Sequence, residues 1–172
     1  WLLIIFLKKK IDDYLKLKNI QLKKFSLITS FAMFYDINDP NSFCKDVGNM
    51  LENNGIWIVE FSYFPLLLKN LTYDQINHEH VTYYTLTTLK NILDRNGLKI
   101  LDINFNDING GSAEIVVSKN SSKHKQSKEK INSILKEESF INFESYKKFN
   151  LRLDNVKKVV NNFLENNKRV IG

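Results

Sequence analysis

Hydrophobic residues along this chain alternate between short continuous runs and stretches in which they recur every three or four positions. The continuous runs are typical of buried strands, which present apolar side chains on both faces of a sheet. They predict strands at 27–31, 56–61, 98–105 and 112–118. The periodic stretches predict amphipathic helices over 41–53 and 85–96. An Asn-Gly pair closes each of them, as is usual where a helix ends.

The order of these elements predicts an α/β fold with a mainly parallel sheet. Strand, helix and strand follow one another twice, and such crossovers are right-handed and join parallel strands. The strands at 98–105 and 112–118 are joined only by the short turn 106–111. We therefore expect these two strands to be antiparallel neighbours.

The two ends of the chain differ from this central unit. Residues 1–25 carry a loose helical pattern, and 119–128 form a polar linker rich in Lys and Ser. Residues 128–167 have a helical pattern with a break near 139–142, and 168–172 look like the first half of a strand. The predicted organisation is an atypical N-terminal helical segment over 1–25, an α/β part over 26–120, and a linker with helices over 121–172.

Composition and charge narrow the function classes. The 172 residues make one ordinary domain, long enough to bury a core without disulfides. Cys44 is the one cysteine of this sequence, which excludes a disulfide or a cysteine-built metal site within it and suits a reducing, cytoplasmic location. The formal charge is +6, but the basic residues gather in the flanks while 25–118 is acidic. Nucleic-acid binding favours a basic stripe interleaved with aromatic residues, so we expect no nucleic-acid partner.

The apolar run at the start does not predict a membrane segment. It covers seven residues, 1–7, whereas a helix that spans a bilayer needs about 20. Three lysines follow it, whereas a signal peptide carries its positive charge before the apolar run. The first residue is Trp1 rather than Met, and we expect the sequence to begin inside a longer protein.

The segment 73–84 holds the densest set of reactive side chains, among them His78, Glu79 and His80. A metal site is one interpretation, but histidines at i and i+2 do not match the helical His-Glu-x-x-His spacing. An exposed loop without a function is the second. The third is acid–base chemistry, because a neutral imidazole can take a proton from a carbon next to a ketone, with a carboxylate to orient it. The residues alone leave all three open.

The turn at 106–112 is a second candidate for function. Gly110, Gly111 and Ser112 lie at the mouth of the predicted hairpin, and paired glycines allow a backbone to approach a ligand closely. On this segment alone, an ordinary turn is the favoured interpretation.

Taken together, these segments form a recognisable set of motifs. In chain order they are Leu27-Ile28-Thr29-Ser30, Phe34-Tyr35-Asp36-Ile37-Asn38-Asp39-Pro40, Asn54-Gly55-Ile56-Trp57-Ile58-Val59-Glu60, His78-Glu79-His80, Tyr83-Tyr84 and Asn109-Gly110-Gly111-Ser112. With them, residues 26–172 resemble the C-terminal half of class I S-adenosylmethionine-dependent methyltransferases, specifically the sugar C-methyltransferases that act on nucleotide-linked 4-keto-deoxysugars. The Glu-His pair followed by the Gly-Gly-Ser hairpin is the most specific of these motifs. Residues 168–172 are similar to the start of the family's C-terminal Rossmann-like domain.

The resemblance implies a fold, a reaction and a set of site residues. The fold would be an incomplete Rossmann-like methyltransferase sheet, with parallel strands, a terminal antiparallel hairpin strand and a C-terminal helical extension. S-adenosylmethionine would be the cofactor and a nucleotide sugar the substrate, with His80 as the catalytic base and Glu79 as its partner. The residues implied for substrate binding are Asn77, His78, Tyr83, Asn109, Gly110, Ser112, Glu60 and Tyr63. Those implied for cofactor binding are Ser30, Phe31 and Phe34, and no metal ligand is assigned.

The chain also departs from the family pattern. The family's glycine-rich S-adenosylmethionine motif and its N-terminal zinc-binding cysteines are absent from this sequence, so zinc would be possible only in a part that precedes it. Asn77 stands where some members carry Tyr, and Asn109 where many carry His. We therefore expect the isolated chain to bind S-adenosylmethionine weakly or not at all, and to be inactive as a methyltransferase. An O- or N-methyltransferase of the same fold, and a non-catalytic remnant or binding module, are the alternatives.

Overall fold

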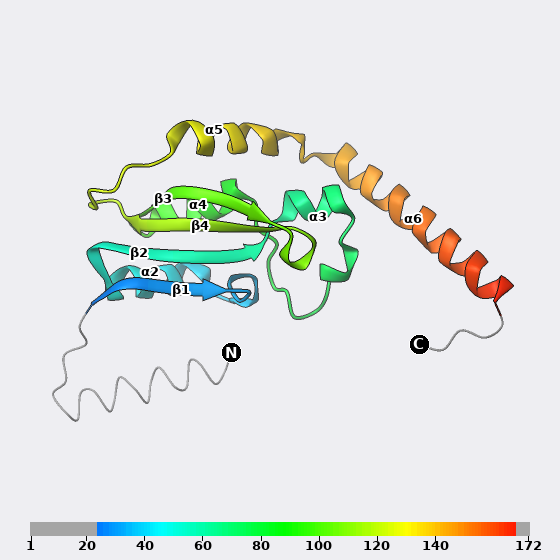
Figure 1. Ribbon diagram of the computed structural model, residues 1–172, viewed down its shortest axis with the longest axis horizontal. Helices are drawn as coiled ribbons and strands as arrows, with labels where there is room; N and C mark the ends of the chain where they lie inside the picture. The colour runs from blue at the N-terminus through cyan, green and yellow to red at the C-terminus, as the bar shows by residue number, and fades with distance from the viewer. Residues whose placement is uncertain (1–23, 168–172) are drawn as a thin grey trace, which may run out of the picture.

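The computed structural model describes residues 24–167 (Figure 1). Its strands are β1 (Phe25–Phe31), β2 (Leu51–Ser62), β3 (Leu98–Asn106) and β4 (Ser112–Lys119). Its α-helices are α2 (Pro40–Met50), α3 (Phe64–Asn70), α4 (Leu86–Arg95), α5 (Lys128–Glu137) and α6 (Phe143–Asn166). The helix predicted over 1–25 lies, except for its last two residues, outside the described residues, and so does the strand predicted at 168–172.

The four strands form one sheet in the order β1–β2–β4–β3. β1 and β2 are parallel, whereas β4 lies between β2 and β3 and is antiparallel to both. The predicted α/β fold and the predicted antiparallel hairpin are therefore confirmed. Ser112 pairs with Ser62 of β2 and with Asn106 of β3. The ends of β2 and β3 and the start of β4 consequently meet at one edge of the sheet.

Local sequence signals explain where the predicted helices begin. Asp39 caps α2 by accepting a hydrogen bond from the backbone nitrogen of Ser42, and proline stands in the first turn of that helix. Thr85 caps α4 in a reciprocal capping box with Thr88. Both starts agree with the sequence pattern.

The predicted end of the first helix is wrong. The helix ends at Met50 rather than near 53, and β2 begins at once with Leu51. Gly55 therefore lies inside β2 and does not stop a helix. A Cβ atom at this position would lie 2.8 Å from the carbonyl oxygen of Phe25, so glycine allows the close approach of β1 and β2 at the point where their register shifts.

The helix α3 was not predicted. The helix follows β2 after a single residue and begins with the continuous apolar run 64–68, in which no alternation of apolar and polar residues marks a helical period. Proline in its first turn favours the helical start, and Leu71 ends the helix in the left-handed conformation, with φ of 59°.

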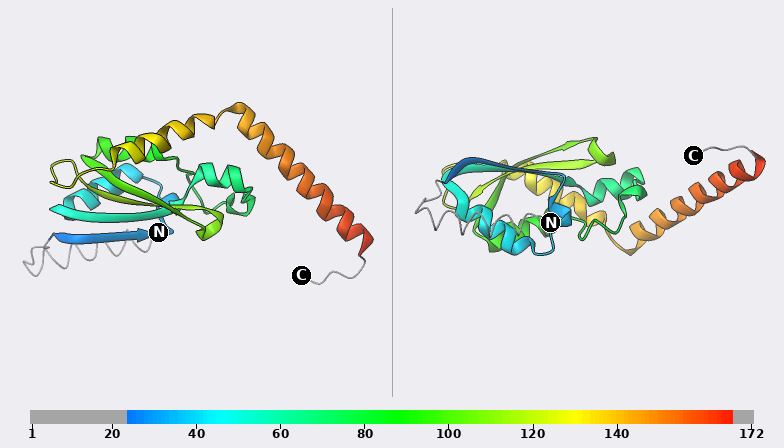
Figure 2. Two further views of the ribbon diagram at one scale, coloured as in Figure 1. Left: turned by 45° about the horizontal axis from the view of Figure 1, so that its top comes forward. Right: turned by 90° about the horizontal axis from the view of Figure 1, so that it is seen from below.

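The core lies between the sheet and the helices α2, α4 and α5, which cover the same face (Figure 2). Along β2, Trp57, Val59 and Phe61 point toward this layer and are fully buried. Phe34 is also fully buried, and its ring contacts the rings of Trp57 and Tyr84. This alternation along β2 leaves the other side of the strand free to carry polar groups at its end.

The C-terminal helices are broken where the sequence predicts. The turn Glu138–Phe140 separates α5 from α6, and Asn142 caps α6 by accepting hydrogen bonds from two backbone nitrogens. α6 packs on α3 through Phe149 and then runs away from the sheet in every view (Figures 1 and 2). Among residues 24–167, no helix combines the length and hydrophobicity needed to cross a membrane.

Candidate functional site

The carboxyl edge of the sheet gathers polar groups from two strands, β2 and β3. Glu60 and Ser62 lie at the end of β2 and are buried. Asn106, at the end of β3, donates a hydrogen bond from its Nδ2 to Oε2 of Glu60 at 3.2 Å. Open α/β sheets bind their ligands outside the carboxyl ends of parallel strands, so this edge is where a site is expected.

His80 lies at this edge, in the loop that joins α3 to α4. Its ring centroid is 4.2 Å from that of Tyr35, which follows β1, and 6.1 Å from that of Tyr83. The backbone nitrogen of Thr82 donates to the carbonyl oxygen of Tyr35 at 3.1 Å, which fixes the loop against the end of β1. Nδ1 of His80 is buried and has no hydrogen-bond partner among residues 24–167.

The remainder of the predicted Glu-His segment is exposed. Oδ1 of Asn77 accepts hydrogen bonds from the backbone nitrogens of Glu79 and His80, at 2.9 and 3.1 Å. Asn77 thus forms a local turn that sets the direction of the following residues. The side chains of His78 and Glu79 point into solvent. In the described part of the chain, no group of three His, Cys, Asp or Glu side chains could hold a metal ion.

Side chains next to His80 have perturbed acidity. Burial raises the pKa of the Asp36 carboxyl; the charge of His80 opposes that rise and the charge of Glu79 adds to it. Burial, followed by the negative charges of Asp36 and Glu60, raises the pKa of the Tyr35 hydroxyl. These groups therefore share one weakly solvated environment, in which charge on any of them affects the others.

The loop before His80 is tied to the end of β2. Ser62 donates from its hydroxyl to Oε1 of Gln75 at 3.4 Å. Tyr83 donates from its hydroxyl to the carbonyl oxygen of Gln75 at 3.3 Å. Tyr83, predicted to bind substrate, is therefore placed beside the imidazole of His80 and in contact with the start of the loop.

The β3–β4 turn approaches α3 through its glycines. Gly110 and Gly111 have φ of 75° and 137°, and a Cβ atom on Gly110 would lie 2.0 Å from a methyl carbon of Thr72. Asn70 donates to the carbonyl oxygen of Gly110 at 2.7 Å. Packing of the turn on its neighbours therefore accounts for both glycines. Asn109 is exposed, with φ of 53°.

Ser112 at the base of this turn is buried, and its hydroxyl donates to the carbonyl oxygen of Ile108 at 2.9 Å. It supports the turn from within. The structure thus brings Asn109 to the open side of the turn and keeps Ser112 on its inner side.

The three residues predicted for cofactor binding have different surroundings. Ser30 is buried and accepts a hydrogen bond from Nε1 of Trp57 at 3.0 Å. Phe34 is fully buried in the core. Phe31, the last residue of β1, is 51% exposed and is the one of the three with a side chain open to a ligand.

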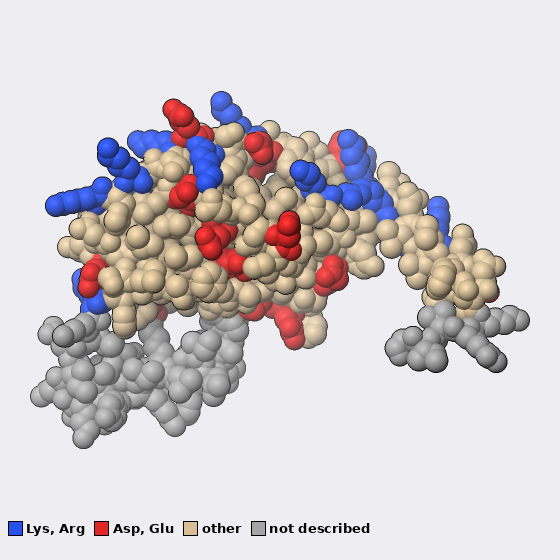
Figure 3. All heavy atoms as spheres, in the orientation of Figure 1, with Lys and Arg blue, Asp and Glu red and all other residues tan. Residues whose placement is uncertain are grey.

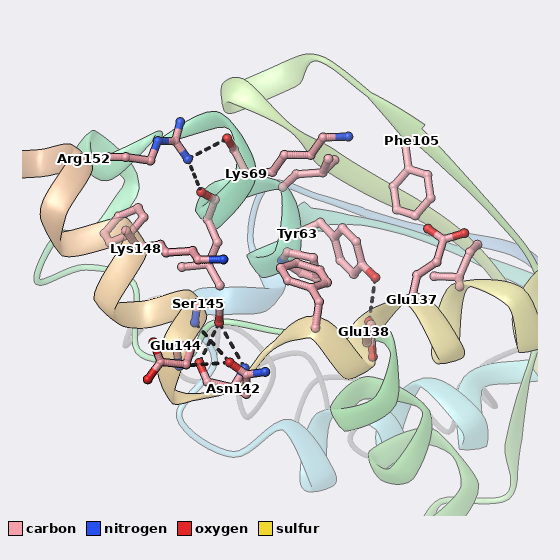
Figure 4. A pocket seen from close by; sticks show the side chains of 16 residues that line it. Tyr63, Lys69, Phe105, Glu137, Glu138, Asn142, Glu144, Ser145, Lys148 and Arg152 are labelled. Carbon is pink, nitrogen blue, oxygen red and sulfur yellow. Dashed lines mark hydrogen bonds between the residues drawn. The ribbon is translucent and has the colours of Figure 1, made fainter.

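Tyr63 lies apart from His80, in the wall of a pocket of about 860 Å³ between α3, β3, α5 and α6 (Figure 4). Its hydroxyl donates to Oε1 of Glu138 at 2.6 Å, and its ring lies against that of Phe105. Figure 4 also shows Arg152 of α6 turned toward α3, where it donates to two backbone carbonyl oxygens. Neither Glu60 nor His80 lines this pocket.

Sequence reasoning did not single out Tyr35, Asp36, Ser62 and Gln75 as parts of the site. Tyr35 and Asp36 belong to a motif that carried the family resemblance, but Asp36 was read as part of a turn before α2. Their position in the motif was the available signal. Contact with His80 depends on how the loop 71–85 folds back, and no periodicity shows that.

The charge of the surface follows the sequence pattern. Figure 3 shows Lys and Arg gathered along the upper side, over the linker after β4 and α5, and Asp and Glu over the middle of the molecule. The edge with His80 thus belongs to the acidic part of the chain, 25–118.

Comparison with known proteins assigns the class. The family model "Methyltransferase domain" matches residues 8–103, more than half of the chain, and the chain therefore belongs to this methyltransferase family. A second model, "C-methyltransferase C-terminal domain", matches residues 107–171. Both matches confirm the resemblance to S-adenosylmethionine-dependent methyltransferases that the motifs predict.

A particular relative is C-methyltransferase NovU of Streptomyces niveus. The chain is 31% identical to it over 98 residues, which are 57% of this chain and 23% of NovU. The chain thus spans less than a quarter of the length of this curated relative.

Two solved structures also match. One is magnesium protoporphyrin IX methyltransferase from Synechocystis PCC 6803, at 12% identity and a TM-score of 0.46, over 56% of this chain and 46% of that chain. The other is the O-methyltransferase NcsB1 from neocarzinostatin biosynthesis, at 12% identity and a TM-score of 0.44, over 58% of this chain and 30% of that chain.

Proposed function

We propose that this chain carries the base of a cytoplasmic C-methyltransferase that methylates a carbon next to the ketone of a nucleotide-linked deoxysugar. The match to a C-methyltransferase C-terminal domain and the identity to NovU support the C-methyl class. The observation that carries the proposal is His80, a half-buried imidazole held against Tyr35 at the carboxyl edge of the sheet.

In this proposal His80 takes the proton from the carbon next to the ketone. The electron pair of the broken C–H bond remains on the substrate as an enolate, and the imidazole becomes an imidazolium. Bound S-adenosylmethionine supplies a methyl group that is activated by the positive charge on its sulfur. His80 then returns its proton to solvent, and Glu79, at the mouth of the site, is available as its acidic partner.

One of the three residues implied for cofactor binding has a side chain that could contact a cofactor at the end of β1. Phe31 offers an exposed aromatic face at the edge of the sheet where open α/β folds bind ligands. Ser30 and Phe34 instead hold the neighbouring backbone in place through the core, by way of Trp57. We assign Phe31 to cofactor contact and the other two to support.

The sugar would lie between His80 and the β3–β4 turn. Glu60 and Asn106 form a hydrogen-bonded pair on that side of the sheet, and Asn109 has an exposed amide that can donate and accept hydrogen bonds. The exposed His78 stands at the rim of the same loop. These side chains offer hydrogen bonds that a sugar hydroxyl or keto oxygen can use.

Solvent exchange tests this function directly. The chain is incubated in D₂O with a dTDP-linked 4-keto-6-deoxyhexose, and loss of the proton next to the ketone is followed by NMR. We expect exchange above the buffer rate, and a loss of about 10²–10⁴-fold in His80→Asn, the usual contribution of a general base. His124→Asn, remote from the site, is the matched control and should leave the rate unchanged.

Each other outcome contradicts the proposal. Exchange at the buffer rate in the wild-type chain would show that the chain carries no base for this proton. Equal exchange in His80→Asn would place the base elsewhere. In the full-length enzyme with added S-adenosylmethionine, transfer of a methyl group to a substrate oxygen without exchange at carbon would assign an O-methyltransferase.

A further inference from the structure

Two buried polar atoms at the end of β1 lack hydrogen-bond partners among residues 24–167. They are Oδ1 of Asp36 and Nδ1 of His80. Buried polar atoms in folded proteins are nearly always paired, because an unmade hydrogen bond costs about 1–3 kcal/mol. One of these atoms is an acceptor and the other can carry a proton, so each offers what the other lacks.

The backbone already holds the two residues side by side. Asp36 ends the single turn Phe34–Asp36, and its backbone nitrogen donates to the carbonyl oxygen of Met33 at 3.2 Å. Tyr35, the residue before it, contacts the ring of His80 and accepts a hydrogen bond from Thr82 of the same loop. The charge of His80 also acts on the Asp36 carboxyl, as expected for close neighbours.

We propose that Asp36 is the positioning residue of His80, its Oδ1 accepting a hydrogen bond from Nδ1–H of the imidazole. The catalytic consequence rests on the proposed function, but the pairing itself does not. Such a bond selects the tautomer in which Nδ1 carries the proton, so that Nε2 keeps its lone pair for a substrate. Catalytic hydrogen bonds are often long in a protein without its ligand and tighten when the ligand binds.

Other charged groups near the imidazole are less suited to this role. The Glu79 side chain is exposed, and the turn made by Asn77 engages its backbone. Glu60 is engaged by the amide of Asn106. The Tyr83 hydroxyl is engaged by the carbonyl oxygen of Gln75. The raised pKa of the Tyr35 hydroxyl keeps it neutral when the imidazole changes charge. Within the part of the chain that the structure describes, Asp36 therefore has the one buried carboxylate oxygen beside His80 that lacks a hydrogen-bond partner.

The pairing would also stabilise the charged form of the base. When His80 takes a proton from carbon it becomes an imidazolium, and a carboxylate in the same weakly solvated corner lowers the free energy of that state. The two sites are reciprocally linked, so removal of His80 should raise the pKa of Asp36 further.

The tautomer of His80 is the decisive measurement, because packing alone does not move it. The chain is labelled with ¹⁵N, and the neutral imidazoles are observed by NMR of their ring nitrogens. We expect the proton of His80 mainly on Nδ1 in the wild type and mainly on Nε2, as in free histidine in water, in Asp36→Leu. Asp36→Asn keeps an acceptor oxygen and should retain the Nδ1–H form. The exposed His78 provides an internal reference in every spectrum.

Two further variants locate the effect. Glu79→Gln and Asp107→Asn should both leave the tautomer of His80 unchanged, the first because its side chain is exposed and the second because it lies in the β3–β4 turn. In His80→Asn, the carboxyl carbon of Asp36 should titrate at higher pH than in the wild type. In the exchange assay, Asp36→Leu should lower the rate by tenfold or more, and Asp36→Asn by less.

The proposal is overturned if wild-type His80 carries its proton on Nε2, or if Glu79→Gln changes the tautomer while Asp36→Leu does not. If Asp36→Leu misfolds, the proposal is still tested, because Asp36→Asn and the wild-type spectrum report on the same hydrogen bond. A correct tautomer without solvent exchange would leave the pairing in place and reject the C-methyltransferase function.

Discussion

Replacement of Glu138 should weaken the attachment of the C-terminal helices to the methyltransferase sheet. Glu138 is only 7% exposed and lies in the turn between α5 and α6. Its carboxylate accepts hydrogen bonds from the backbone nitrogens of Leu86 and Thr87, and from the hydroxyls of Thr87 and Tyr63. It therefore caps the first turn of α4 from a distant part of the chain and places a negative charge at the positive end of that helix.

The size of the effect follows from these four bonds. A hydrogen bond to a charged group contributes about 1.5–3 kcal/mol, and a negative charge at a helix N-terminus about 0.3–1 kcal/mol or more. The bonds share one carboxylate, so they are not additive, and water can enter the space left by the side chain. We expect Glu138→Ala to lower the free energy of unfolding by about 3 kcal/mol. Glu138→Gln, which keeps one acceptor oxygen, should lower it by about 2 kcal/mol.

Urea denaturation of the chain at neutral pH measures both values by linear extrapolation. Glu137→Ala is the matched control, because the preceding side chain is exposed and makes no such bonds, and it should change the free energy by less than about 0.5 kcal/mol. Equal effects of the Glu138 and Glu137 variants would refute the reasoning, since the buried carboxylate would then contribute no more than an exposed one.

Two further predictions concern backbone strain and pH. Gly110→Ala should lower the free energy of unfolding in urea by about 2–3 kcal/mol, because it adds a clash with Thr72 to a positive φ. Gly97→Ala has a similar φ but open space around it, and should lower this free energy by about 1 kcal/mol. Equal losses in the two variants would show that the contact with Thr72 does not contribute. Burial raises the pKa of the Cys44 thiol from 9.0 to about 12, so the unfolded chain loses its proton first and stability falls as pH rises between these values. The loss due to Cys44 should be about 1.4 kcal/mol between pH 8 and 10. It should be missing in Cys44→Ala, and an equal slope in both proteins would contradict it.

Most of the fold could be predicted because local signals agree with the final packing. The capping residues Asp39 and Thr85 mark helix starts in the sequence and occupy those positions in the structure. The place of β4 between β2 and β3 had no such signal, because a hairpin can lie on either side of its partner. The Asn-Gly pair at Gly55 led to a wrong predicted end for the first helix. In the sequence, a glycine that allows two strands to approach closely looks the same as a glycine that ends a helix.

The site was only partly predictable. His80 stood out because its residue type and its neighbours allow acid–base chemistry whatever the fold, and the family resemblance implies that role. Asp36 did not, because its contact depends on the loop after α3 folding back onto the end of β1, over more than 40 positions of sequence. The family resemblance also implied Phe34 as a cofactor-binding residue, although its ring lies in the core.

The loop that carries His80 is held at three places, which fixes the position of the proposed base although much of the loop is exposed. Its early part is bonded to the end of β2 through Ser62 and Gln75. Its middle is bonded to the end of β1 through Tyr35. Its end forms a bridge to Tyr63, next to the α4 turn that Glu138 caps. Tyr63 therefore contacts both the loop that carries His80 and the carboxylate from the C-terminal helices, so the extension helps to hold the proposed base in position.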